Sequence, residues 1–251
     1  MNEEAVSIAT PHGQADAYFY QPEGQGPWPG VLFFTDGSGI RQAKRDMAAR
    51  LAAAGYAVLM PNPFYRDGPA GEVGLGHPGA DEDVASIVSR YGAFARRISD
   101  DNGLTKDIGA WLGFMAAQSD VRPGKIACNG YCMGGYFALA AAAYYPERFA
   151  AAASFHGSNL ATDSPDSPHR RAWLMRDQVE LYVGVAGIDP YLQPNETVRL
   201  RGALEGAGVS HVMELYEGAE HGFTVADNEQ YDATSAERHW EAMFAFFART
   251  L

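Results

Sequence analysis

The chain has 251 residues, of which 47% are hydrophobic and 12% aromatic, which is enough for one large packed domain and excludes a disordered chain. The formal charge is −12 and the acidic residues are spread along the chain, which argues against binding to nucleic acid or to an anionic membrane surface. No stretch has the pattern of a secretory signal or of a membrane-spanning helix, so we expect a cytoplasmic protein.

Strand-like and helix-like patterns alternate along almost the whole chain. Two strands over residues 6–10 and 15–20 predict an N-terminal hairpin. Further strands are predicted over residues 30–34, 56–60, 125–128, 150–155, 181–186 and 212–216. Helices are predicted over residues 41–54, 81–98, 104–118, 136–145, 194–205 and 233–250, and loops over residues 64–79 and 159–169. This alternation predicts a single α/β domain over residues 1–251, with a mainly parallel central sheet and helices on both faces.

The segment Gly130-Tyr131-Cys132-Met133-Gly134-Gly135 joins one predicted strand to an alanine-rich helix. Small residues two positions before and two positions after a central residue are the signature of a nucleophile elbow, a strand-to-helix turn too tight for side chains there. The central residue here is Cys132 instead of the commoner serine. Because the positive end of a helix stabilises a thiolate, we expect this thiol to ionise readily. The pattern indicates a hydrolase with Cys132 as its nucleophile.

The other cysteine, Cys128, lies in the preceding strand and is expected to be part of the core. One cysteine in a strand and one at its end are poorly placed for a mutual disulfide, which favours a reduced compartment such as the cytoplasm. Their spacing, with no histidine cluster nearby, is weak support for zinc, so we expect no metal and no cofactor. The glycine-rich stretch over residues 68–79 lacks the Lys-Ser/Thr ending of a phosphate loop.

A cysteine nucleophile needs a base, and the base needs an acid that orients it. Asp189 lies just past one predicted strand and His221 just past the next, which is the order nucleophile, acid, histidine found in α/β-hydrolases. Because such strand ends meet at one edge of the sheet, we expect the three side chains to converge. His221 would accept the proton of Cys132, and Asp189 would orient the imidazole. The competing acids, none of them just past a strand end, are Asp177, Glu180 and Glu220.

The oxyanion of a tetrahedral intermediate needs two hydrogen-bond donors. The elbow provides the backbone N–H of Met133, and the flexible loop after the strand over residues 30–34 makes Gly37 the best second candidate. His156 either lines the pocket or is an ordinary packed histidine. The aromatic residues that form either an apolar pocket or part of the core are Phe64, Tyr65, Tyr91, Phe94 and Trp111.

With these residues assembled, the chain resembles the dienelactone hydrolase family, α/β-hydrolases that open lactones with a cysteine nucleophile. The elbow matches that family almost residue for residue, and residues 187–194, 216–223 and 236–247 are similar to its aspartate, histidine and last-helix segments. The resemblance covers nearly the whole chain. It also implies that Asp36, at a position where the best-known members have glutamate, interacts with Cys132 before substrate arrives.

The chain departs from the family at substrate recognition. Members that act on dienelactone bind its carboxylate with arginines, but neither the position near Thr224 and Val225 nor residues 77–88 contain one. The remaining candidates for that role are Arg66, Arg90, Arg96 and Arg97. We therefore predict a hydrolase of small-molecule esters or lactones other than dienelactone, acting as a monomer or a small homo-oligomer. The alternatives are a non-catalytic ligand-binding or sensing protein on the same fold and a redox role for Cys132.

Overall fold

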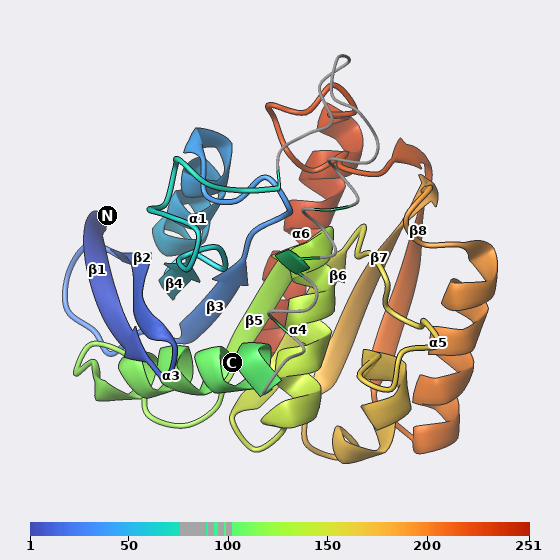
Figure 1. Ribbon diagram of the computed structural model, residues 1–251, viewed down its shortest axis with the longest axis horizontal. Coiled ribbons are helices and arrows are strands. Elements are labelled where there is room, and N and C mark those ends of the chain that lie inside the picture. The colour runs from blue at the N-terminus through green and yellow to red at the C-terminus, as the bar shows by residue number, and fades with distance from the viewer. Residues whose placement is uncertain (76–88, 90–92, 95–97, 99–101) are drawn as a thin grey trace.

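The computed structural model describes residues 1–75, 89, 93–94, 98 and 102–251 (Figure 1). In this part of the chain, eight strands form one sheet in the order β1-β2-β4-β3-β5-β6-β7-β8. The strands are β1 (Asn2–Thr10), β2 (Gly13–Gln21), β3 (Gly30–Phe34), β4 (Ala57–Pro61), β5 (Ile126–Tyr131), β6 (Phe149–Phe155), β7 (Glu180–Ile188) and β8 (His211–Glu220). The pairs that involve β2 are antiparallel and all the others are parallel. The predicted fold class is therefore confirmed.

Helices cover both faces of the sheet. They are α1 (Gln42–Ala53), α3 (Gly103–Ala117), α4 (Met133–Tyr144), α5 (Pro194–Ala207) and α6 (Ala233–Thr250), with a short 3-10 helix η2 (Pro168–Leu174). One core layer joins Leu32 and Phe34 of β3 to α3, α4 and α5, and the other joins Val31 and Phe33 to α1 and α6. Figure 1 shows α4 in front of the sheet and α6 behind it. Since alternate residues of β3 enter two covered layers, the strand consists of apolar residues without a break.

The structure changes a few predicted boundaries. Strands β7 and β8 extend beyond their predicted ends at residues 186 and 216, because their ladder continues past a register shift to the pair Ile188 and Glu220. As a result Asp189 and His221 are the first residues after these two strands. The helix η2, which begins with Pro168, was expected to be partly loop. Most of the helix predicted over residues 81–98 lies outside the described residues.

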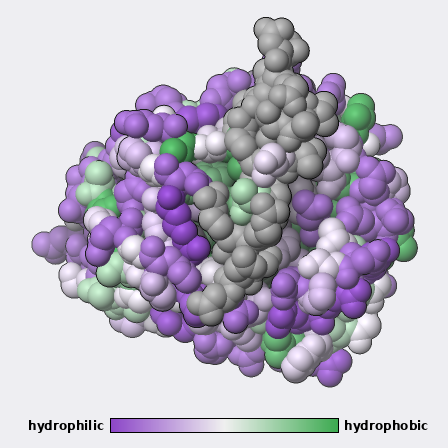
Figure 2. Space-filling view, viewed as in Figure 1, coloured by the Kyte–Doolittle hydropathy of each residue, from purple (hydrophilic) through white to green (hydrophobic). Residues whose placement is uncertain are grey.

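On the face shown in Figure 2, hydrophilic side chains dominate among the coloured residues, and hydrophobic ones form small separate patches. Within the described ranges, no helix combines the length and the apolar character needed to cross a bilayer.

The turn between β5 and α4 brings backbones closer together than side chains allow. A Cβ atom on Gly130 would lie 1.8 Å from the carbonyl oxygen of Gly134, and a Cβ on Gly134 would lie 2.3 Å from the carbonyl oxygen of Thr35. Both contacts are with backbone atoms, so no side chain can rotate away to relieve them. The glycines of the elbow are therefore required by packing between the turn, α4 and the end of β3.

We expect Gly130→Ala to lower the free energy of unfolding by about 2 kcal/mol or more, because the added methyl group overlaps backbone. The matched control is Gly113→Ala on the exposed side of α3, where a Cβ would meet no atom within 4 Å. That substitution should raise stability by about 0.5–1 kcal/mol through helix propensity. Urea denaturation of both variants measures the two effects. An unchanged midpoint for Gly130→Ala would contradict the packing described here.

Candidate active site

Cys132 is the single residue between the end of β5 and the start of α4. Its φ of 55° places it in a backbone conformation that costs energy for a residue with a side chain, as expected for a nucleophile elbow. The Cys132 amide donates to the carbonyl of Phe155, the last residue of β6, over 3.2 Å. The Cys132 carbonyl accepts hydrogen bonds from the amides of Gly135 and Ser158. These bonds fix the turn against the end of β6.

Ser158 is a site residue that the sequence did not single out. Its hydroxyl lies 3.5 Å from the sulfur of Cys132, and the residue is buried. The turn that carries it has two non-glycine residues with positive φ, His156 at 38° and Asn159 at 57°. This turn packs directly on α4, since a Cβ on Gly135 would lie 2.7 Å from the Cα of Gly157. The available signal was its place shortly after the predicted strand over residues 150–155, at the same edge of the sheet as Cys132.

Asp189 and His221 form a hydrogen-bonded pair beside this turn. His221 Nδ1 lies 2.9 Å from each carboxylate oxygen of Asp189, and the Asp189 side chain is 2% exposed. Asp189 Oδ1 also accepts hydrogen bonds from the amides of Tyr191 and Leu192, which fixes the carboxylate independently of the histidine. Of the competing acids, Glu180 is paired with Arg249. Among the described residues, Asp189 is the only one of the four candidate acids whose carboxylate is hydrogen-bonded to the imidazole of His221.

The charges of Cys132 and His221 support each other. Burial lowers the pKa of His221, but the hydrogen bond to Asp189 and the neighbouring Cys132 thiol raise it to about 9. Burial raises the pKa of Cys132, but the neighbouring His221 side chain, with a contribution from Ser158, lowers it below its ordinary value. The two directions together favour a thiolate beside an imidazolium near neutral pH.

The loop after β3 lies against the start of α4. The carbonyl of Gly37 accepts a hydrogen bond from the amide of Leu75 over 2.6 Å, which holds the peptide that follows it. Gly39, with a φ of 74°, lies so close to the carbonyl of Val73 that a Cβ would be 2.5 Å from it. Neither the Gly37 amide nor the Met133 amide donates a hydrogen bond to another described residue. Within the described ranges, these two amides therefore have no partner that a ligand would have to displace.

The remaining candidates have structural partners. His156 is buried and its Nε2 lies 2.8 Å from the hydroxyl of Thr224, while its ring centroid lies 5.0 Å from that of His221. Burial and the neighbouring His221 hold the pKa of His156 well below its usual range, so it is neutral. Asp36 is turned toward α1 and binds Arg41 and Lys44. Cys128 belongs to the core, as predicted.

Most of the aromatic residues considered for a pocket belong to the core instead. Phe64, Phe94 and Trp111 are buried in the layer that contains α3 and α4, and the rings of Phe64 and Phe94 are 4.6 Å apart. The hydroxyl of Tyr65 is hydrogen-bonded to Asp107. Tyr91 lies outside the described residues.

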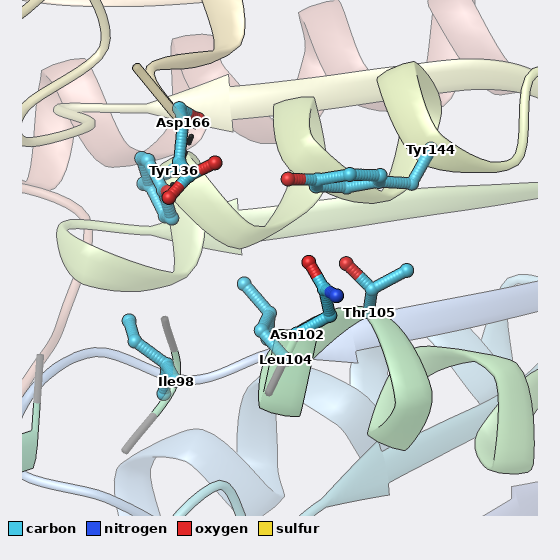
Figure 3. A pocket seen from close by; sticks show the side chains of 7 residues that line it. All are labelled: Ile98, Asn102, Leu104, Thr105, Tyr136, Tyr144 and Asp166. Carbon is cyan, nitrogen blue, oxygen red and sulfur yellow. Dashed lines mark hydrogen bonds between the residues drawn. The ribbon is translucent and has the colours of Figure 1, made fainter. Parts of the chain in front are cut away.

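A small hollow between α3 and α4 is separate from this site (Figure 3). Its volume is about 20 Å³, enough for a water molecule and too small for a substrate. The lining residues are Ile98, Asn102, Leu104, Thr105, Tyr136, Tyr144 and Asp166. In the part of the chain that the structure covers, no group of three histidine, cysteine or acidic residues is placed to hold a metal ion.

A mostly parallel sheet with a thiol on a strand-to-helix turn, facing a histidine–aspartate pair on two later strand ends, defines the class of α/β-hydrolases. The chain belongs to the dienelactone hydrolase family, whose model matches residues 15–251. It is therefore an enzyme of the hydrolase class.

Individual relatives are distant but similar over most of their length. A protein of Synechocystis sp., provisionally named carboxymethylenebutenolidase, is 24% identical over 250 residues, covering 98% of this chain and 96% of its own. The carboxymethylenebutenolidase of Rhodococcus opacus is 25% identical over 245 residues, covering 96% and 89%. The crystal structure of a provisionally assigned dienelactone hydrolase from Klebsiella pneumoniae superposes with a TM-score of 0.82 at 23% identity, covering 98% of both chains.

Proposed function

We propose that the chain hydrolyses a carboxylic ester or lactone through Cys132, His221 and Asp189, with an acyl-thioester intermediate. The observation that carries this proposal is how the three side chains are placed relative to one another. The thiol lies on a strained elbow, and the adjacent imidazole is held by a buried carboxylate at 2.9 Å. A thiolate prepared in this way is a nucleophile without a metal or cofactor.

The reaction then has two halves. The Cys132 thiolate attacks the carbonyl carbon, and the amides of Gly37 and Met133 donate to the oxyanion that forms. The C–O bond breaks, the imidazolium of His221 protonates the departing oxygen, and the acyl group stays on sulfur. Neutral His221 next removes a proton from water, the hydroxide attacks the thioester, and the thiolate leaves as the carboxylic acid is released. Asp189 stabilises the imidazolium in both halves.

We further propose that the substrate carries no carboxylate for the enzyme to bind. Thr224 and Val225, which follow His221, are buried and uncharged. Among the described candidates, Arg66 is paired with Asp107 over 2.9 Å and is thus already engaged. Arg90, Arg96 and Arg97 lie outside the described residues. Burial of a substrate carboxylate without a cation beside it would be costly.

Both cysteines are free thiols, which supports the cytoplasmic location expected from the sequence.

The test is rapid-quench mass spectrometry of the enzyme mixed with pairs of esters and lactones that differ only in a carboxylate. We expect turnover of the neutral member of each pair and an added acyl mass on the peptide that contains Cys132. Preference for the carboxylate-bearing members would refute the substrate assignment alone. Turnover without an acylated enzyme would refute the thioester, and absence of turnover across the panel would favour a ligand-binding protein.

A further inference from the structure

Lys44 is a fully buried lysine on the inner side of α1, and the proposed reaction does not use it. Its side chain is 0% exposed. The Nζ atom lies 3.0 Å from Oδ2 of Asp36 and 4.4 Å from the ring centroid of Tyr131, the residue before the nucleophile. Lysine is almost never fully buried without a partner, because the loss of hydration of the ammonium group is costly. Asp36 is the partner that makes this burial tolerable.

Among the described residues, the hydrogen-bond and ion-pair partners of the Asp36 carboxylate belong to α1, its N-terminus and the loop before it. Oδ1 accepts from Arg41 Nη1 over 2.7 Å and from the Ser38 amide over 3.0 Å. Oδ2 accepts from Arg41 Nη2 over 3.1 Å and lies beside Lys44. Rotation of this carboxylate toward Cys132 would leave Lys44 buried without a counter-ion. The thiol instead has the hydroxyl of Ser158 as its hydrogen-bond partner.

The same cluster joins the two loops that carry the proposed catalytic groups. Arg41 also binds Asp227, over 2.8 Å and 3.0 Å, and the side-chain oxygen of Asn228 over 3.3 Å. Asn228 in turn donates to the carbonyl of Gly222, the residue after His221. The loop that contains Gly37 and the loop that contains His221 are thus tied together through Asp36 and Arg41.

We propose that Lys44 is a positioning residue that holds the Asp36 carboxylate in place near the nucleophile and neutralises the charge of that carboxylate. Two consequences follow. The carboxylate stays out of contact with Cys132, and its negative charge opposes formation of the thiolate less strongly. The inference takes from the proposed function only the role of Cys132 as the nucleophile.

The charges around the two groups are consistent with this role. Burial raises the pKa of Asp36, but Lys44 and Arg41 lower it to about 2, so it is ionised. Burial, with a smaller contribution from Arg41, lowers the pKa of Lys44 below its ordinary value, although Asp36 and the nearby thiol of Cys132 favour its protonated form. The other described titratable groups that face this cluster are Asp227 beside Arg41, His221 beside Cys132, and Tyr131, His156 and His239 near Lys44. Tyr131, His156 and His239 are neutral near pH 7, because burial shifts each pKa away from ionisation.

The test measures the pKa of the Cys132 thiol from the rate of iodoacetamide alkylation against pH. Lys44→Met should raise this pKa by roughly one unit. At pH values below the thiol pKa, this reduces the thiolate fraction about tenfold. Asp36→Asn should shift the pKa in the opposite direction, and Asp36→Asn/Lys44→Met should return it close to that of the natural protein. The control Lys125→Met, an exposed lysine before β5, should leave it unchanged. Alkylation of the Cys132→Ala variant measures the background reaction of the other cysteine, Cys128.

Opposite shifts distinguish this role from a purely structural one, in which both single variants would lose stability without moving the thiol pKa in opposite directions. An unchanged thiol pKa in Lys44→Met, or shifts of the same sign, would overturn the proposal. If Lys44→Met does not fold, the comparison of Asp36→Asn with the double variant measures the same effect. Alkylation needs no substrate, so failure of ester hydrolysis would overturn the proposed function and leave this result readable.

Discussion

Replacement of Cys132 by alanine should lower kcat/KM for the best ester or lactone substrate by about 10⁴-fold or more. The reason is that no other described nucleophile is positioned to replace the thiolate. Ser158, whose hydroxyl lies 3.5 Å from the sulfur, contacts no base among the described residues that would activate it. Turnover of a neutral substrate and the melting temperature are measured together, because the fold should tolerate this small substitution.

The matched control is Cys128→Ala. This cysteine is also free, but it is fully buried and burial raises the pKa of its thiol well above the usual range. We expect this variant to retain activity within about threefold and to lose about 1 kcal/mol of stability through the lost packing. Full activity of Cys132→Ala, or loss of activity in Cys128→Ala at unchanged stability, would contradict the assignment of the nucleophile.

Asp189→Asn is expected to reduce kcat/KM by about 10²- to 10⁴-fold and to narrow its pH profile. In the natural protein the active thiolate–imidazolium pair should be lost as pH rises past the His221 pKa of about 9. Without the carboxylate the imidazolium is less stable, so this alkaline limb should move to lower pH. The acidic limb, set by Cys132, should move to higher pH, because the two groups titrate as a pair.

The sign of the linked stability effect also follows from the raised pKa of His221. A folded-state pKa of about 9 against an ordinary value of 6.5 stabilises the fold fully below the lower value, and this contribution is lost as pH rises through 9. The melting temperature of the natural protein should therefore fall more steeply over this range than that of Asp189→Asn. Glu180→Gln, which removes a surface pair with Arg249, is the control and should leave the pH profile unchanged. An unaltered alkaline limb in Asp189→Asn would refute the role of Asp189.

Much of the fold was predictable because its signals are local. Continuous apolar runs bounded by proline and glycine indicated β3 and β4, since both faces of these strands are covered by helices. The closing helix was predicted with its observed bounds, Ala233–Thr250, because one apolar stripe continues along it. The ends of β7 and β8 were predicted too early, because pairing across a register shift is a property of two strands together.

The sequence by itself determined the pattern on which the proposed chemistry rests: an elbow that admits only small neighbours around Cys132, followed in order by Asp189 and His221 at the ends of strands. Each of these signals is contained in a few consecutive residues, where the geometry of a turn or a strand end limits the choice of side chain. Only the tertiary structure decided which groups surround the thiol. Ser158 reaches it through a strained turn after β6, and Lys44 and Arg41 hold Asp36 against α1. These contacts depend on the packing of segments far apart in the chain, where desolvation and charge pairing select partners that no local pattern specifies.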